Sequence, residues 1–162
     1  MAKKTLLEGK RILAVDDEPD VLETLEELLP MCRLTKAQSA QEALKLLESQ
    51  SFDIAILDIM GVDGYKLLEV ARKKGVIPVM LTANALSVEN TIKSFKEGAA
   101  SYIPKDEMGN IATFLVDILE AQKKGKNFWW RWLDRLGAYY EKKFGPDWQS
   151  KDEEFWRHFP SW

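Results

Sequence analysis

The alternation of short apolar runs with segments of helical periodicity constrains the fold of this chain more than any other feature of its sequence. The apolar runs predict strands at residues 11–15, 33–37, 54–57, 79–82 and 100–103. The first and third runs are continuously apolar, which is typical of strands buried on both faces of a sheet. Because strands that alternate with helices form parallel sheets covered on both sides, we predict an α/β fold with a doubly wound, five-stranded parallel sheet.

Several of the expected helices carry recognisable start signals. Pro19 suits the first position of a helix, because its missing N–H would have no partner there. Ser39 and Glu42 fit a capping box, in which each residue satisfies a backbone N–H near the helix start. We also predict that the side chains of Asp63 and Ser87 cap the next two helices.

Polar side chains follow four of the five expected strands. They are Asp16 and Asp17 after the first strand, Asp58 after the third, Thr82 at the end of the fourth and Lys105 after the fifth. Because the carboxyl ends of parallel strands meet at one edge of a sheet, we expect these side chains to form one cluster. Crowded carboxylates need a cation among them, and oxygen ligands suit Mg²⁺.

This cluster fits the transfer of a phosphoryl group to a carboxylate. Asp58 is the best candidate nucleophile, because it stands alone after the central apolar strand, whereas the adjacent Asp16 and Asp17 are better placed to bind metal. Each residue alone also has an ordinary structural explanation: an acidic pair before a proline is commonly only a helix N-terminus. The coincidence of all of them at strand ends favours the functional interpretation.

The sequence resembles the receiver domains of bacterial response regulators over about residues 9–122. The matching segments are ILAVDDEP at 12–19, ILD at 56–58, DGY at 63–65, VMLTA at 79–83, GA at 98–99 and YIPK at 102–105. The resemblance implies a flavodoxin-like receiver fold with strand order 2-1-3-4-5. It also implies a role in two-component signalling, with a histidine kinase or a histidine phosphotransfer protein as the phosphodonor.

The resemblance further assigns roles to individual residues, with Asp58 as the phosphoacceptor. The Mg²⁺ ligands that it implies are Asp16, Asp17, Asp58 and the backbone carbonyl of Met60. Thr82 and Lys105 would contact the phosphoryl group, and Tyr102 matches the aromatic residue that turns inward when Thr82 is drawn toward the phosphate. The implied switching surface comprises residues 88–95, Tyr102 and the exposed side of residues 111–122.

Two departures from the family pattern lie close to the expected site. The loop formed by residues 59–62 is about two residues shorter than usual and lacks its proline, and Gly61 would permit the tighter turn. Lys105 is followed by Asp106 where a proline is usual. We therefore expect a working site with altered kinetics of phosphorylation and dephosphorylation.

Residues 123–162 differ in composition from the rest and predict a C-terminal, mainly helical aromatic extension to a receiver domain at 9–122. All six tryptophans of the chain lie in this extension, which has a net charge of +3, whereas residues 1–121 have a net charge of −6. One helical stripe is formed by Trp129, Trp132, Leu133, Leu136 and Tyr140. We predict that this helix ends near residues 145–146 and that a short helix follows at 152–159.

Three interpretations of the aromatic stripe remain open. It can dock on the receiver domain, it can mediate homodimerisation or bind a partner protein, or it can lie on a membrane surface. The acidic residues 152–154 count against the membrane, so we expect no membrane contact. We also expect no DNA binding, because the extension is short and only mildly basic.

The leading functional hypothesis is a cytoplasmic, stand-alone receiver that signals to an unknown protein partner by protein–protein contact. We expect such a chain to catalyse its own Mg²⁺-dependent phosphorylation and dephosphorylation, without being a conventional enzyme. The alternative is a phosphorylation-independent receiver scaffold that acts through its aromatic tail. An aspartate-based phosphatase fits less well, because Met60 stands where such a mechanism needs a second acid. The single Cys32 and the single His158 exclude an internal disulfide and a Cys/His metal cluster.

Overall fold

The computed structural model describes residues 6–83, 86–124 and 129–158 of the 162-residue chain, and it contains all five predicted strands. The strands are β1 (Arg11–Val15), β2 (Arg33–Ala37), β3 (Ile54–Asp58), β4 (Ile77–Thr82) and β5 (Ser101–Pro104). The helices that alternate with them are α2 (Pro19–Leu28), α3 (Ala40–Ser49), α4 (Gly64–Lys73), α5 (Val88–Lys96) and α6 (Ile111–Lys123). A 3₁₀ helix, η1 (Lys105–Asn110), connects β5 to α6.

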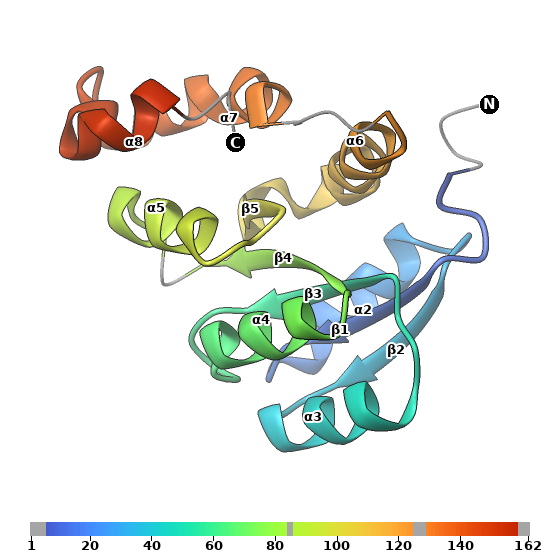
Figure 1. The fold of residues 1–162 in the computed structure, drawn as a ribbon. Helices are drawn as coiled ribbons and strands as arrows, with labels where there is room; N and C mark the ends of the chain where they lie inside the picture. The colour runs from blue at the N-terminus through green and yellow to red at the C-terminus, as the bar shows by residue number, and fades with distance from the viewer. Residues whose placement is uncertain (1–5, 84–85, 125–128, 159–162) are drawn as a thin grey trace.

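The five strands form one parallel sheet in the order β2-β1-β3-β4-β5, which is the order that the resemblance implied. Helices α2 and α6 contact each other on one face of the sheet, and α3 and α4 contact each other on the opposite face (Figure 1). The central strands β1 and β3 consist almost entirely of buried residues, as their continuous apolar sequences predict. This arrangement brings the carboxyl ends of all five strands to one edge.

The helix start signals are confirmed with one exception. Pro19 is the first residue of α2, the Ser39 hydroxyl accepts a hydrogen bond from Glu42 N, and the Ser87 hydroxyl accepts one from Asn90 N. Asp63 occupies the cap position of α4, but its side chain makes no capping hydrogen bond, so that prediction is wrong. Its backbone has a positive φ of 55°, and Asp63 therefore provides the tight turn that we expected of Gly61.

The C-terminal segment folds as α7 (Trp129–Phe144), η2 (Trp148–Asp152) and α8 (Glu153–His158), in agreement with the predicted helical aromatic extension. Trp132, Leu136 and Tyr140 of the predicted stripe are fully buried, and Leu133 is partly buried. The side chain of Trp129 lies outside the described residues. No helix in the described ranges is both long enough and apolar enough to cross a membrane.

The C-terminal segment packs on the part of the fold formed by α5, β5 and α6 (Figure 1). The Trp132 ring contacts the Phe95 ring of α5 edge-on, with 5.0 Å between centroids. Of the three interpretations of the stripe, docking on the receiver domain is therefore the one that the structure contains. The docked segment corrects one expectation, that residues 111–122 present an exposed side as part of the switching surface. Val116 and Asp117 of α6 are buried where the segment packs.

Candidate functional site

A cleft of about 290 Å³ lies at the carboxyl edge of the sheet, where the sequence predicted a polar cluster. The residues that line it are Asp17, Glu18, Asp58, Met60, Gly61, Thr82, Ala83 and Lys105. They come from the last residues of β3 and β4 and from the segments that follow β1, β3, β4 and β5, which the parallel topology brings together. Among the residues predicted from the sequence for this cluster, Asp16 does not line the cleft, but it contacts Lys105 beside it.

Lys105 is the cation at the centre of this cluster. Its Nζ lies 2.9 Å from Asp16 Oδ2, 3.2 Å from Glu18 Oε1 and 3.6 Å from Asp58 Oδ1. Burial lowers the pKa of Lys105, but the hydrogen bond to Asp16 and the charges of Asp16 and Asp58 outweigh burial, so that its pKa lies above the usual value. The Lys105 ammonium therefore stays charged and offsets part of the repulsion among the carboxylates.

Glu18 is a member of the cluster that we did not single out from the sequence. Its carboxylate lies on the cleft and pairs with Lys105, whereas its backbone N–H donates a hydrogen bond of 2.9 Å to Asp16 Oδ1. The only available signal was its position directly after the acidic pair. That position is equally typical of a helix start, so sequence alone did not separate the two roles.

Asp58 is the nucleophile candidate, and only 7% of its surface is exposed. Its Oδ2 accepts a hydrogen bond of 3.1 Å from Gly61 N. Burial, followed by the negative charge of Asp16, raises the pKa of Asp58 above its usual value, although Lys105 and Gly61 act in the opposite direction. A buried carboxylate under such repulsion is stabilised when it gains cationic partners.

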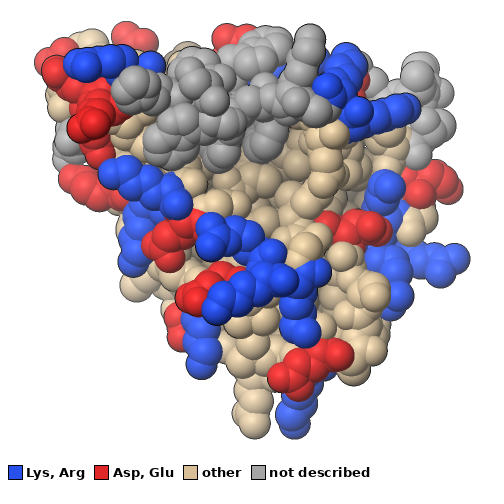
Figure 2. Space-filling view, in the orientation of Figure 1, with Lys and Arg blue, Asp and Glu red and all other residues tan. Residues whose placement is uncertain are grey.

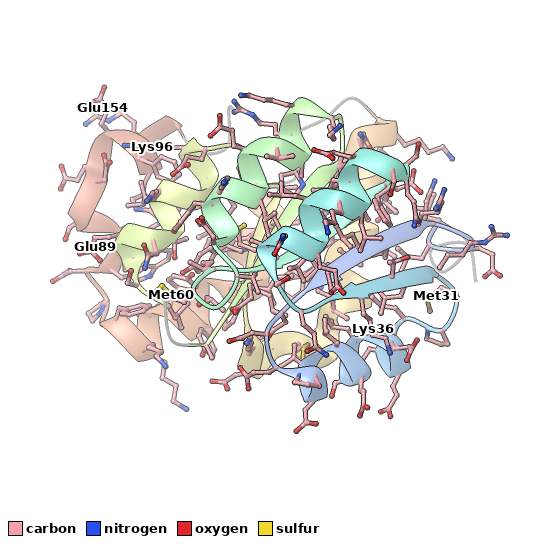
Figure 3. The ribbon with its side chains drawn as sticks, turned by 90° about the horizontal axis from the view of Figure 1, so that it is seen from below. Met31, Lys36, Met60, Glu89, Lys96 and Glu154 are labelled. Atoms are coloured by element: carbon pink, nitrogen blue, oxygen red, sulfur yellow. The ribbon has the colours of Figure 1, made fainter. Side chains whose placement is uncertain are left out.

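The short loop after Asp58 fits closely against the acidic residues. A Cβ atom on Gly61 would lie 2.4 Å from Asp17 Oδ1, and one on Gly64 would lie 2.3 Å from the backbone oxygen of Asp58. At Gly64 the contact is with backbone, so no side chain fits there, whereas a side chain at Gly61 would force the Asp17 carboxylate to move. The Met60 side chain, in contrast, projects away from the edge of the sheet and is 68% exposed (Figure 3).

The residues at this edge fit a Mg²⁺ ion. Asp16, Asp17 and Glu18 each offer a carboxylate oxygen, and these oxygens lie within 4.8 Å of one another. All of the donors are hard oxygen atoms, which Mg²⁺ prefers, and the open cleft leaves room for the water ligands that Mg²⁺ usually retains. Gly61 keeps the space beside Asp17 free of a side chain.

Thr82 and Tyr102, the two residues that the resemblance linked to switching, are both buried on neighbouring strands. Thr82 ends β4 and lines the cleft, whereas Tyr102 lies in β5 and pairs with Met80 in the sheet register. Burial raises the pKa of Tyr102, and hydrogen bonds to the Thr91 side chain and the Ser87 backbone partly offset that rise. Tyr102 is therefore turned into the protein and held there by α5 and the residue that caps it.

Comparisons with known proteins agree with this geometry. Residues 12–114 match the family model of the response regulator receiver domain. The two-component response regulator ARR18 of Arabidopsis thaliana is 38% identical over 103 residues, which cover 60% of this chain and 16% of that protein. The two-component response regulator ORR24 of Oryza sativa subsp. japonica is 40% identical over 104 residues, again covering 60% of this chain and 16% of the relative.

The fold agrees with a solved structure as well. A response regulator receiver domain protein (CheY-like) from Methanospirillum hungatei JF-1 superposes with a TM-score of 0.65 and 32% identity, over 73% of this chain and 99% of that one. The plant relatives are much longer than the region that they share with this chain. The family match covers more than half of the sequence and includes each strand whose end contributes to the cleft, so this chain belongs to the response regulator receiver domain family of two-component systems.

Proposed function

We propose that this chain accepts a phosphoryl group on Asp58 from a histidine kinase or a histidine phosphotransfer protein. The observation that carries the proposal is the convergence of Asp58, Thr82 and Lys105 on one cleft beside the Asp16–Glu18 carboxylates. Membership of the receiver family supports the same assignment. We place the receiver domain at residues 9–122, the extension at 123–162, and the protein in the cytoplasm.

In the proposed reaction, a carboxylate oxygen of Asp58 attacks the phosphorus atom of the phosphohistidine. The bond between phosphorus and the imidazole nitrogen breaks, and the nitrogen keeps the electron pair and takes up a proton from water. The Lys105 ammonium, 3.6 Å from Asp58 Oδ1, is within reach of an oxygen of the transferred group. The Thr82 hydroxyl contacts a second phosphoryl oxygen.

The metal in this proposal is Mg²⁺, held by the carboxylates of Asp16, Asp17 and Asp58 and the backbone carbonyl of Met60. When bound, it neutralises negative charge on the phosphoryl oxygens. The chain itself aligns the acceptor: the Gly61 N–H fixes one oxygen of Asp58, and burial keeps that carboxylate poorly solvated. When the aspartyl phosphate is hydrolysed, a water molecule attacks the phosphorus atom, and the Asp58 carboxylate leaves into the position that the Gly61 N–H holds.

Thr82 and Tyr102 form the switch in this proposal. When Thr82 turns toward the phosphoryl group, it vacates space on its inner side, and Tyr102 occupies its buried position there. The buried state of Tyr102 therefore corresponds to the phosphorylated form. In this proposal the signal passes to a protein partner. On the face seen in Figure 2, basic and acidic side chains intermingle, so this face is not the uniformly basic patch that DNA binding needs.

The test of this proposal is phosphorylation by acetyl phosphate in the presence of Mg²⁺. We expect a single modification, stable in acid and labile in base, that is absent from Asp58→Asn. Asp53→Asn is the matched control, because Asp53 precedes the same strand at its opposite end. Failure of acetyl phosphate and of every histidine kinase of the host to modify the wild type would contradict the proposal.

The phosphorylation-independent scaffold makes the opposite prediction. It requires that Asp58→Asn leaves partner binding unchanged and that Mg²⁺ does not bind at the acidic cluster. A Mg²⁺ titration followed by NMR of the amides of Asp17 and Gly61 decides between the two hypotheses. Shifts at both amides that reach saturation favour the phosphoacceptor.

A further inference from the structure

Two adjacent tyrosines of α7 contact the two segments that leave the phosphoacceptor cleft. The Tyr140 hydroxyl lies 2.7 Å from Thr91 Oγ1, in the first turn of α5, the helix that follows β4 and Thr82. The Tyr139 hydroxyl donates a hydrogen bond of 3.1 Å to Asp106, the residue directly after Lys105. The tail, which comprises α7, η2 and α8, thus touches the residue directly after Lys105 and the helix that follows Thr82 in the chain.

Thr91 is the junction of a buried hydroxyl network. Its Oγ1 donates to the Ser87 carbonyl oxygen at 2.7 Å and meets the Tyr140 hydroxyl, and it also bonds to the hydroxyl of Tyr102. The side chains of Tyr102 and Tyr140, like that of Thr91, have no exposed surface. Buried hydroxyl groups are stable only while all of them are satisfied, so Tyr102 and Tyr140 depend on each other through Thr91.

A second contact ties the tail to the same residue of β5. The indole Nε1 of Trp132 donates a 2.9 Å hydrogen bond to the backbone carbonyl oxygen of Tyr102. The Trp132 ring also lies 5.3 Å from that of Tyr140, edge to face. The docked tail therefore holds Tyr102 at its backbone through Trp132 and at its hydroxyl through Tyr140 and Thr91.

We propose that the α7–α8 segment is an intramolecular ligand of the α5–β5–α6 face, and that its docking is positively coupled to phosphorylation of Asp58 through Thr91 and Tyr140. This inference rests on the proposed function, which assigns the buried state of Tyr102 to the phosphorylated form. The docked tail stabilises that same state. Coupling between two binding equilibria is reciprocal. The phosphoryl group therefore favours the docked tail by the same factor by which the docked tail favours the phosphorylated form.

The consequence for signalling is that phosphorylation closes the α5–β5–α6 face with the protein's own tail. A partner of the phosphorylated chain contacts the outer surface of α7 and α8, whereas a partner of the unphosphorylated chain gains access to the apolar residues that the tail covers. Those residues include Phe95 and Tyr102. The tail is thereby the output element of this receiver.

Beryllofluoride with Mg²⁺ serves as the phosphoryl probe for the full-length chain, and hydrogen exchange of the α7 amides reports docking. Tyr140→Phe removes one hydroxyl and keeps the ring. In wild type we expect beryllofluoride to slow exchange in α7 by about five-fold or more, the lower end of typical coupling between linked sites. In Tyr140→Phe we expect that slowing to disappear and the beryllofluoride affinity measured by calorimetry to fall by a similar factor.

Thr91→Val, which removes the junction hydroxyl from the other side, should give the same two losses. Asp152→Asn is the matched control, because the 3.0 Å pair between Lys96 and Asp152 joins the tail to the last residue of α5, whereas Thr91 lies near the start of that helix. It should speed α7 exchange in the free protein but keep the effect of beryllofluoride. Circular dichroism verifies that each variant is folded.

Unchanged or faster α7 exchange on addition of beryllofluoride to wild type would overturn the coupling, as would an undiminished effect in both Tyr140→Phe and Thr91→Val. Labelling of Asp58 by acetyl phosphate separates this result from failure of the proposed function. If Asp58 is labelled and the tail does not respond, only the coupling is wrong. If Asp58 is never labelled, the proposed function and the coupling both fall.

Discussion

The indole nitrogen of Trp132 donates a hydrogen bond to the backbone carbonyl oxygen of Tyr102 on the edge strand β5. Edge strands carry backbone groups without a partner strand, and a side chain or helix that covers them limits unwanted pairing. In this protein the cover is supplied by a segment 30 residues further along the chain. The same hydrogen bond therefore covers the edge of the sheet and holds the backbone of Tyr102, the predicted switch residue.

Trp132→Phe should destabilise the protein by about 2–3 kcal/mol, because a buried carbonyl loses its donor and the core loses volume. The measurement is urea unfolding followed by circular dichroism. Tyr139→Phe, which removes a hydrogen bond at the protein surface, is the control and should change the unfolding free energy by less than about 0.5 kcal/mol. Equal effects of the two variants would contradict the structural role of the Trp132–Tyr102 bond.

Asp117 of α6 anchors the tail through two arginines. Its buried carboxylate accepts hydrogen bonds from Arg135 and lies 3.3 Å from Arg131 Nη1. A double-mutant cycle of Asp117→Ala and Arg135→Ala should give a coupling energy of about 1–2 kcal/mol, since hydrogen bonds to charged groups exceed neutral ones and Arg135 is partly hydrated.

The exposed pair Glu69–Lys73 on α4 is the reference for that cycle. Its members lie one helical turn apart and are mostly in water, so the same cycle there should show no coupling above error. A similar result for Asp117 and Arg135 would mean that the arginines are not anchors of the tail.

Asp58→Asn should stabilise the metal-free protein at neutral pH by roughly 1 kcal/mol, the typical size of a single-site effect. Burial and the charge of Asp16 raise the pKa of Asp58 in the folded state above its usual value of 3.8. The folded state therefore binds the proton more tightly than the unfolded state, and stability falls as the pH rises from 3.8 through the raised pKa. At pH values above the raised pKa, Asp58 is fully charged in the folded state, and its charge lowers the stability by the full amount.

Thermal unfolding in EDTA at several pH values tests this sign. The advantage of Asp58→Asn should vanish below the usual pKa, where both states of the wild type are protonated at this residue. Millimolar Mg²⁺ should stabilise the wild type more than the variant, because the metal would bind the folded state and use the Asp58 charge. An Asp58→Asn protein that is less stable than wild type at pH 7 would contradict the prediction that the Asp58 charge destabilises the metal-free folded state.

Gly61→Ala should weaken Mg²⁺ binding by about 10-fold or more, as substitutions that displace a metal ligand do. The new Cβ would lie 2.4 Å from Asp17 Oδ1 and would force that carboxylate to move. Gly109→Ala is the matched control, because a Cβ there has no atom within 4 Å. Calorimetric titration with Mg²⁺ measures both; equal affinities in the two variants would show that Asp17 does not bind the metal.

The sequence alone predicted the sheet and the polar cluster at its carboxyl edge. Continuous apolar runs such as 54–57, alternating with helices, predict a parallel sheet, and the polar residues that end those runs then meet at one edge. Local signals such as Ser39 and Ser87 were equally reliable, because a helix cap depends on contacts three residues apart. Asp63 failed as a predicted cap, since the positive φ of the short loop turns its side chain away from that role.

Tertiary structure decided what the aromatic stripe covers and how the tail meets Tyr102, the predicted switch residue. An amphipathic pattern states that a helix buries one face, but it does not state against which surface, because hydrophobic burial is non-directional. Specificity came from polar contacts across long sequence distances, such as Tyr140 with Thr91 and Arg135 with Asp117. Those pairs leave no periodic signal, so only the folded chain shows that the tail lies on the face beside Tyr102.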